Sequence, residues 1–285
     1  MEIYEHIYGS LFAATKAALL AGEKIMEIYK ESDLRIDWKE DESPVTAADF
    51  DSNRIIKQTL VAESCYTVLS EEDPDIPYRF RKNTKTLWLV DPLDGTREFI
   101  NKNDEFAVNI ALIFDEKPIL GVIYLPALEK LYFAAESIGA FRRDHINASA
   151  LRANISLNFA SENAVALPSA PQERPPKILC SRSHGDRKML QIIKQLEAEY
   201  PQAKVEKCGA SLKQCAVAEG SADLALTTGK TMEWDTAAGD AILRICGGEM
   251  LDFEGKPLLY NKENLANPPF FIRSKHSAIS RDFKR

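Results

Sequence analysis

The stretch Leu87-Trp-Leu-Val-Asp91-Pro-Leu-Asp94-Gly-Thr96-Arg-Glu-Phe-Ile100 joins an apolar segment to two closely spaced acids. Residues 86–90 predict a buried strand, and the proline is expected to end it. Asp91 and Asp94 then flank a predicted tight turn, and Gly95-Thr96 marks a helix start. Hard cations such as Mg²⁺ prefer carboxylate oxygens, and helix N-termini bind anions. The stretch therefore predicts a divalent-cation site and an anion site in one short loop.

The composition is that of a globular protein with one large domain or two ordinary ones. The chain has 285 residues, of which 45% are hydrophobic and 28% charged, and its formal net charge is -7. A negative balance argues against a nucleic acid polymer as partner, although bound metal ions would still allow a small anionic substrate. No apolar run approaches the roughly 20 residues of a membrane span, and no secretory signal is visible. We therefore expect a cytoplasmic protein without stable membrane insertion; whether it is a monomer or a homodimer stays open.

Five cysteines are spread along the chain without a C-x-x-C pair: Cys65, Cys180, Cys208, Cys215 and Cys246. Their odd number and wide spacing favour reduced, mostly buried thiols, as is usual in the cytosol.

The first half predicts helices packed on a largely antiparallel sheet. Apolar positions recur at helical spacing over residues 7–29, and Thr46 with Asp49 forms a capping pattern that opens a helix reaching about Ala62. Strands are expected at 67–70, 86–90, 106–114, 118–124 and 131–135, with a hairpin turn at 115–117.

The second half alternates strand and helix and therefore predicts an α/β arrangement. A proline-rich connection at 161–176 precedes it. Strands are expected at 178–180 and 222–227, and helices at 186–200 and 236–245. We interpret residues 1–160 as an N-terminal α+β metal-binding half and residues 177–285 as a C-terminal half that supplies Asp235 and substrate contacts.

Further acids stand at the ends of predicted elements. Asp235 could simply cap a helix, Glu71-Glu72 could be solvated loop charge, and Asp49 could only complete the capping pattern. Two-metal phosphatases, however, need several carboxylates that converge from different segments. Together with Asp91 and Asp94, these acids provide the right ligands where loops are expected to meet.

Two signatures resemble those of the Mg²⁺-dependent, lithium-sensitive inositol monophosphatase superfamily: Asp91-Pro-Leu-Asp94-Gly-Thr96 and Trp234-Asp235-x-Ala-Ala-Gly239. The upstream segments 43–49 and 69–73 fit the same superfamily, and the resemblance covers nearly the whole chain. Within it, the chain is most similar to bacterial 3'(2'),5'-bisphosphate nucleotidases of sulfur assimilation. The segments that carry this closer likeness are 91–100, 106–124, 181–184, 211–213, Cys215 and 218–220.

The resemblance implies a mixed α+β and α/β fold, a layered αβαβα sandwich of the sugar-phosphatase type, with two or three Mg²⁺ ions per site. It implies metal ligation by Glu71, Asp91, the backbone carbonyl of Leu93, Asp94 and Asp235. It implies that Asp49 and Thr96 orient and deprotonate the attacking water. It implies substrate binding by Gly95, Thr96, Ser181, Arg182, His184, Ser211 and Lys213, with Lys39 and Glu72 in supporting positions.

The implied reaction removes the 3'-phosphate of adenosine 3',5'-bisphosphate by metal-activated water and gives AMP and phosphate. The D-x-D spacing of aspartyl-phosphate enzymes is absent from Asp91-Pro-Leu-Asp94, so no covalent phosphoenzyme is expected. An inositol monophosphatase, a broad sugar-phosphate phosphatase and a catalytically silent binding protein are the alternatives. Ser183 could instead cap a helix, and Lys213 could be solvated.

Two positions depart from the nucleotidase pattern. Ala210 stands where those relatives usually have serine, and Thr227 stands where they have an arginine expected to bind the nonscissile phosphate. Losing an Arg–phosphate pair should matter, since it is among the stronger hydrogen-bonded pairs. Thr228 stands where inositol-specific relatives carry glutamate, which disfavours that alternative. The cations that could replace the arginine are Lys230, Arg182 and Arg244.

Overall fold

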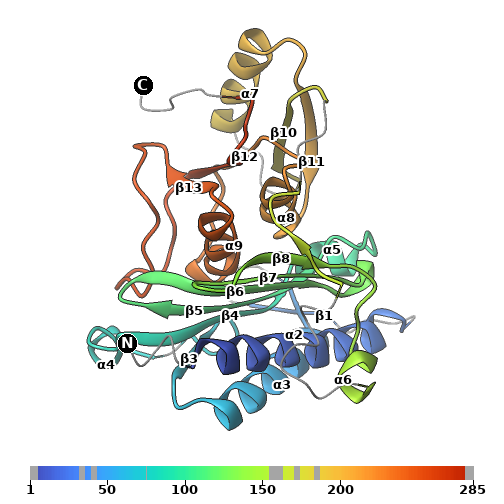
Figure 1. The fold of residues 1–285 in the computed structure, drawn as a ribbon, viewed down its shortest axis with the longest axis vertical. Helices are drawn as coiled ribbons and strands as arrows, with labels where there is room; N and C mark the ends of the chain where they lie inside the picture. Colours follow the sequence, from blue (N-terminus) through green and yellow to red (C-terminus); the bar gives the residue numbers. More distant parts are fainter. Residues whose placement is uncertain are drawn as a thin grey trace.

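The computed structural model of the chain describes residues 6–31, 36–39, 44–74, 76–153, 163–169, 174–182 and 187–279. These residues form five layers (Figure 1): a helix pair, a seven-stranded sheet, a second helix pair, a five-stranded sheet and an outer helix. The first pair is α2 (Ile7–Tyr29) with α3 (Ala47–Glu63), the second α8 (Leu212–Glu219) with α9 (Glu233–Ile245), and the outer helix is α7 (Arg187–Glu199). The layered α/β sandwich implied by the sequence is confirmed.

The seven-stranded sheet has the order β3-β4-β5-β6-β7-β8-β9, and of its neighbouring pairs β3–β4 is parallel whereas the others are antiparallel. Its strands are β3 (Thr67–Ser70), β4 (Thr86–Asp94), β5 (Ala107–Phe114), β6 (Lys117–Leu125), β7 (Lys130–Ala135), β8 (Gly139–Arg143) and β9 (Val165–Ala166). Both faces are covered, so successive residues of β4 enter different cores. Trp88 packs on the side of α2 and α3, whereas Leu89 packs on the side of α8 and α9.

Helix α9 lies directly on this sheet because β6 has a glycine at the crossing. A Cβ at Gly121 would lie 2.2 Å from the Ala238 carbonyl oxygen, so a larger residue would push the helix away. This close approach carries the N-terminus of α9, and with it Asp235, toward the ends of the strands.

The five-stranded sheet is mixed, with the order β11-β10-β12-β14-β13. Its strands are β10 (Lys177–Ser181), β11 (Lys204–Cys208), β12 (Leu224–Thr227), β13 (Glu249–Asp252) and β14 (Phe270–Arg273). The central strands bury residues on both faces: Ile178 contacts the core under α7, and Leu179 contacts the core shared with α8 and α9. The remaining elements are β1 (Ile36–Trp38), β2 (Pro44–Thr46), α4 (Tyr78–Arg81), α5 (Thr96–Ile100), the 3-10 turn η1 (Pro126–Leu128) and α6 (Ser149–Ala153).

The expected turn at Asp91-Pro-Leu-Asp94 was wrong. Strand β4 continues to Asp94, and its register with β5 shifts between Asp91 and Asp94. Proline lacks an N–H to donate, and strands tolerate it at such irregular positions. One helix boundary also differs from expectation, since α9 begins at Glu233 and not at Thr236, whereas α5 begins at Thr96 as predicted.

The proline-rich region 161–176 includes β9, which pairs with β8 at the edge of the first sheet. The division of the chain there into two halves stays a prediction. All five cysteines are free thiols, and His6, His145 and His276 are exposed.

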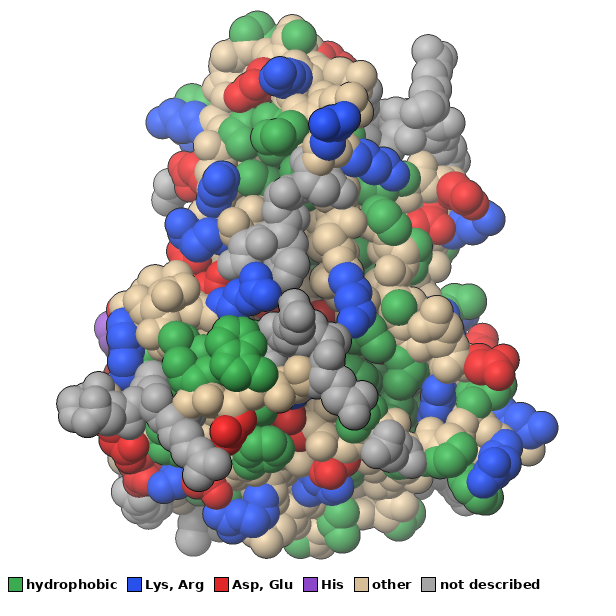
Figure 2. Space-filling model, turned by 180° about the vertical axis from the view of Figure 1, so that it is seen from behind, with side chains coloured by type: hydrophobic (Ala, Val, Ile, Leu, Met, Phe, Trp, Pro, Cys, Tyr) green, Lys and Arg blue, Asp and Glu red, His purple; other side chains and the backbone are tan. Residues whose placement is uncertain are grey.

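Charge is mixed on one face of the molecule. In Figure 2, Lys and Arg side chains are interspersed with Asp and Glu side chains on the face shown. A nucleic acid polymer is bound by clustered basic residues, so this face has no resemblance to such a surface. None of the helices in the described part of the chain combines the length and apolarity needed to cross a membrane.

Candidate active site

Three acids from distant segments meet at one end of the first sheet. Single carboxylate oxygens of Glu71, Asp91 and Asp235 all lie within 4.8 Å of one another. Glu71 directly follows β3, and its N–H donates to the Val90 carbonyl at 3.1 Å, which places it beside the end of β4. Asp235 occupies the first turn of α9, where Oδ2 accepts from the Met232 N–H at 2.8 Å. We call Glu71, Asp91, Asp94 and Asp235 the acid cage.

The cage holds concentrated negative charge away from water. Asp91 is 2% exposed, and its burial, followed by the charges of Glu71, Asp94 and Asp235, raises its pKa well above the usual range. The pKa of Asp235 is also raised well above its usual value, by burial, Glu71 and Asp94. Such a cluster of oxygen donors fits a hard cation such as Mg²⁺, because bound positive charge offsets repulsion that would otherwise cost stability.

Hydrogen bonds hold Asp94 in its orientation. Its Oδ2 accepts from Ser211 Oγ at 2.5 Å and from Asn109 Nδ2 at 3.2 Å. Asn109 also donates to Ser211 Oγ at 2.8 Å, and Gln214 Nε2 donates to the Asp235 carbonyl at 2.7 Å. Side chains from β5 and from the start of α8 therefore fix the acids of the cage together.

A second cluster joins the predicted catalytic pair. Thr96 Oγ1 lies 3.1 Å from Asp49 Oδ1 and 3.3 Å from the Leu93 carbonyl. Asp49 is the third residue of α3, and its Oδ2 accepts from both the N–H and the hydroxyl of Thr46, each at 2.7 Å. The predicted capping pattern is confirmed. Burial raises the pKa of Asp49 to about 6, although the hydrogen bonds from Thr46 and Thr96 act in the opposite direction.

Gly95 connects the cage to α5 in a left-handed conformation, with φ 88°. A Cβ there would lie 2.9 Å from the Glu105 carbonyl oxygen and 3.0 Å from Ala210 Cβ. Glycine is therefore required both for the backbone angle and for the close approach of Glu105 and Ala210. The predicted start of a helix at Thr96 depends on this residue.

Lys39 supports the outer edge of the cage. Its ammonium donates to Glu71 Oε1 at 2.8 Å and to Glu72 Oε1 at 2.6 Å. Burial raises the pKa of Glu72 to about 7 against the opposing effect of Lys39. Burial lowers the pKa of Lys39, but Glu71 and Glu72 raise it more, so the ammonium stays charged. This contact matches the supporting position predicted for Lys39 and Glu72.

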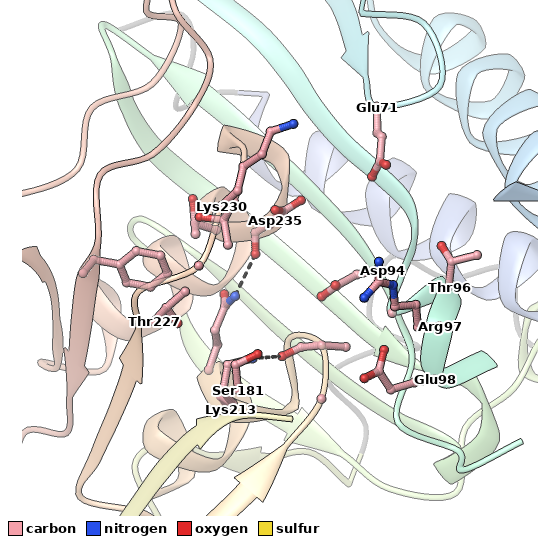
Figure 3. A pocket seen from close by; sticks show the side chains of 18 of the residues that line it. Glu71, Asp94, Thr96, Arg97, Glu98, Ser181, Lys213, Thr227, Lys230 and Asp235 are labelled. Carbon is pink, nitrogen blue, oxygen red and sulfur yellow. Dashed lines mark hydrogen bonds between the residues drawn. The ribbon is translucent and has the colours of Figure 1, made fainter. Parts of the chain in front are cut away.

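The cage opens into a pocket whose lining comes from residues 44–98 and from residues 181–272 (Figure 3). Figure 3 shows Glu71, Asp94 and Asp235 facing this space from separate elements, with Thr96 beside Asp94. The predicted site residues that line the pocket are Glu71, Asp94, Gly95, Thr96, Ser181, Lys213 and Asp235. Thr227, at the end of β12, and Lys230, on the connection from β12 to α9, line it as well.

Arg182 is engaged with protein groups. Its guanidinium forms a bidentate pair with Glu105, at 2.8 and 2.6 Å, and donates to the Lys207 carbonyl at 3.1 Å. Glu105 also accepts from the Gly209 N–H at 2.8 Å. The pair therefore supports the loop that leads into α8. The predicted residue His184, like Ser183, lies outside the described residues.

Comparison with known proteins shows the family to which the chain belongs. A model of the inositol monophosphatase family matches residues 10–284. The chain belongs to the inositol monophosphatase family. It is 41% identical over 255 residues to the 3'(2'),5'-bisphosphate nucleotidase CysQ of Salmonella typhimurium, a match that covers 88% of this chain and 94% of that protein.

Two further relatives extend the comparison. The CysQ nucleotidase of Escherichia coli K12 is 41% identical over 257 residues, covering 88% of this chain and 94% of that protein. The crystal structure of CysQ from Bacteroides thetaiotaomicron, a bacterial member of the family, matches with a TM-score of 0.83 and 40% identity. That match covers 93% of this chain and 97% of the other. The family resemblance expected from the sequence is confirmed.

Within this family site, sequence reasoning missed the side chains that brace the acids. Asn109 is a single polar residue in an apolar strand and lies opposite Asp91 across β4 and β5, a signal that could have been noticed. Ser52 Oγ donates to the Pro92 carbonyl at 2.7 Å and fixes the irregular part of β4. Gln214 had no local signal, because only packing of α8 against α9 brings it to Asp235.

Proposed function

We propose that this family member is a Mg²⁺-dependent phosphomonoesterase that removes the 3'-phosphate of adenosine 3',5'-bisphosphate and releases AMP and phosphate. The observation that carries the proposal is the acid cage, with three oxygens within 4.8 Å beside the hydrogen-bonded pair Thr96 and Asp49. The nucleotidase names of relatives 41% identical over most of the chain supply the substrate class.

Mg²⁺ would be held by the carboxylates of the acid cage and the Leu93 carbonyl, where it would neutralise phosphoryl oxygens and make water more acidic. How many ions bind, two or three, is part of the proposal. The oxygen-only ligand set and the burial of the acids fit this cation.

The chain's own groups would position the water and receive its proton. Thr96 Oγ1 donates to Asp49, so its lone pairs face away and can accept a proton from water while its own proton passes to Asp49. The water oxygen forms a bond to phosphorus as the bond to the ribose oxygen breaks, and that oxygen takes up a proton to complete the alcohol. Gly95 and Thr96 line the pocket, and their backbone N–H groups would hold the reacting phosphate.

A second candidate, an inositol or broad sugar-phosphate phosphatase, is favoured by one observation. Thr227 lines the pocket where an arginine was expected, so this one position is small and uncharged. A neutral residue at this position would tolerate substrates with a single phosphate.

Phosphate release by the purified protein tests both candidates. The substrates are adenosine 3',5'-bisphosphate and inositol 1-phosphate, each with Mg²⁺ and with a chelator in its place. We expect Mg²⁺-dependent release with clear preference for the nucleotide. A preference for the inositol ester would select the second candidate, whereas tight nucleotide binding without turnover at saturating Mg²⁺ would identify a silent binding protein.

A further inference from the structure

The first turn of α9 supplies Asp235 to the acid cage, and a loop between β13 and β14 holds this turn. We call residues 261–267 the clamp loop. We propose that Glu233, which binds the clamp loop, and Arg81, which anchors it near the start of β4, are positioning residues that set Asp235 in the acid cage for Mg²⁺. The inference rests on the proposed function, and neither Glu233 nor Arg81 is among the described residues that line the pocket.

Glu233 is a fully buried carboxylate at the start of α9, with 0% of the residue exposed. Its Oε2 accepts from the Asn261 N–H at 2.5 Å, and its Oε1 accepts from the Lys262 N–H at 2.9 Å and from the Lys262 ammonium at 2.7 Å. A buried carboxylate is unfavourable unless donors surround it. Because both oxygens are bound here, the carboxylate fixes the clamp loop against the start of α9.

The clamp loop also holds the residue that orients Asp235. The Met232 N–H donates to Asp235 Oδ2 at 2.8 Å. The Met232 carbonyl in turn accepts from Asn267 Nδ2 at 2.7 Å, and Asn267 also donates to Thr236 Oγ1 at 3.0 Å. The clamp loop is therefore attached to the chain on both sides of Asp235, so a displaced loop would move this carboxylate.

Arg81 anchors the clamp loop from the opposite side. It is 4% exposed and is the last residue of α4. Its guanidinium donates to Asn261 Oδ1 at 3.0 Å, to the Lys262 carbonyl at 2.6 Å and to the Glu263 carbonyl at 3.1 Å. In return, Asn261 Nδ2 donates to the Arg81 carbonyl at 2.9 Å. The start of the clamp loop is therefore held by Arg81 and Glu233 together.

Strand β4 relates this anchor to the other acids. It begins at Thr86, shortly after Arg81, pairs with β3 and β5, and carries Asp91 and Asp94 toward its other end. The clamp loop thus ties the helix that carries Asp235 to the strand that carries these two acids. Replacing a buried ion pair by apolar residues is often neutral or stabilising, so stability alone does not account for the charges. What they supply is a fixed geometry for groups that must converge on a metal ion.

The test measures Mg²⁺ affinity directly. Isothermal titration calorimetry with Mg²⁺ gives the Kd of the parent and of each variant. Glu233→Gln keeps the side-chain shape but turns one oxygen into a donor that faces the donors of the clamp loop. We expect the Kd to rise about tenfold, as is typical when a group that supports a metal ligand is lost. Arg81→Met should raise the Kd by a similar factor.

Activity at saturating Mg²⁺ separates positioning from ligation. Glu233→Gln leaves the Asp235 carboxylate present, so most of the phosphate release should return when the Mg²⁺ concentration is raised. Asp235→Asn removes a ligand and should stay impaired at the same concentration. Combining Glu233→Gln with Arg81→Met should weaken Mg²⁺ binding by less than the product of the two single effects, because both residues act through the clamp loop.

A matched control removes a comparable arginine elsewhere. Arg174 donates to Asp223 Oδ2 at 2.6 Å, to the Pro175 carbonyl at 3.1 Å and to the Gly220 carbonyl at 2.7 Å, so it joins one side chain and two carbonyls, as Arg81 does in the clamp loop. It is not one of the described residues that line the pocket. Arg174→Met should lower the Tm and leave the Kd for Mg²⁺ and the activity unchanged.

Arg81→Lys is the milder variant, and it decides the question if Glu233→Gln or Arg81→Met does not fold. Lysine keeps the charge but lacks the planar fork that reaches several acceptors. The Kd for Mg²⁺ should therefore rise by less than with Arg81→Met, but still above that of the parent. Thermal melting of each variant shows that it is folded at the temperature of the titration.

The outcomes distinguish this inference from the function on which it rests. If the parent binds Mg²⁺ but releases no phosphate from the nucleotide, the proposed function fails, and the Kd values still decide whether the clamp loop positions a metal ligand. If the parent binds no Mg²⁺, both fail. If the parent is active and the variants of Glu233 and Arg81 bind Mg²⁺ as tightly as it does, the clamp is wrong and the phosphatase stands. The same conclusion follows if Arg174→Met weakens Mg²⁺ binding as much as they do.

Discussion

The two walls of the pocket differ in how their side chains are held. On the wall that Glu71, Asp94 and Asp235 form, Asp94 accepts hydrogen bonds from Ser211 and Asn109, and Asp91 is buried in the same strand, β4. On the other wall, Lys230 is exposed on a connection, and the hydroxyl of Thr227 lacks a partner among the described residues. The acids proposed for chemistry are therefore fixed by buried neighbours, whereas the other wall combines a buried strand end at Thr227 with an exposed connection at Lys230.

The largest loss of activity should come from removing one carboxylate of the acid cage. Asp91→Asn and Asp235→Asn keep side-chain shape but each remove a carboxylate of the acid cage. We expect kcat/KM to fall about 100- to 1,000-fold at saturating Mg²⁺, the size of effect seen when a group that stabilises transition-state charge is lost. Phosphate release measures this, and circular dichroism should show an intact fold. Variants as active as the parent would contradict the ligand assignment.

A smaller loss of activity should follow from removing a hydrogen bond that orients Asp94. Ser211→Ala removes the hydroxyl that donates to Asp94 at 2.5 Å. We expect a roughly 10- to 100-fold loss of activity or of Mg²⁺ affinity, as is typical for partners of metal ligands. Ser221→Ala is the matched control, because that exposed hydroxyl only bonds the Ala216 carbonyl and a neighbouring glutamate near the end of α8. Equal losses in both variants would show that Ser211 has no special role.

Removing Mg²⁺ should lower the melting temperature of the protein, because the acids of the cage then repel one another without a bound cation. Mg²⁺ binds the folded chain and not the unfolded one, so a concentration about 100 times its Kd stabilises by about 2.7 kcal/mol. For a chain of this size that corresponds to a rise in Tm of several degrees, at roughly 2–4 °C per kcal/mol. Differential scanning calorimetry with and without a chelator measures the shift.

The variant Asp91→Asn tests whether the Mg²⁺ that causes this shift in Tm binds at the acid cage. Burial and the neighbouring acids disfavour the ionised form of Asp91, so the metal-free variant should melt no lower than the metal-free parent. Its Mg²⁺-induced shift should be much smaller, since one ligand is gone. A parent and variant with equal shifts would mean that the cation binds elsewhere.

The smallest effect should be on stability, and it should come from a substitution at Gly95, which follows the acid cage residue Asp94 in the chain. Gly95→Ala should destabilise the chain by about 1–3 kcal/mol, because φ is 88° and the new Cβ would crowd Glu105 and Ala210. Gly9→Ala is the opposite control: it lies in α2 with nothing within 4 Å of a Cβ, so alanine should stabilise by about 0.5–1 kcal/mol. Urea denaturation of both variants measures whether each substitution lowers or raises the free energy of unfolding. If Gly9→Ala destabilised the protein as much as Gly95→Ala, the backbone angle and crowding at Gly95 would not explain the effect.

Local patterns predicted those elements whose causes are local. The helix at 7–29, the capping pair Thr46 and Asp49, and the hairpin before Lys117 follow from periodicity, side-chain bonding and turn residues close in sequence. The turn expected at Asp91-Pro-Leu-Asp94 failed because pairing with β5 extends the strand through an irregular register. Strands β11, β13 and β14 were missed, since their short segments are defined by neighbours from other parts of the chain.

For the site, the sequence by itself determined which chemical groups are available: acids at element ends, a Gly-Thr helix start, and cations in the second half. Only the tertiary structure decided that Glu71, Asp91 and Asp235 converge, that Arg182 is paired with Glu105, and that Lys230 lines the pocket. The physical reason is the different distance along the chain over which the interactions act. Helix and strand preferences act over a few residues, whereas convergence depends on how α9 packs on a sheet built from segments far away in the chain.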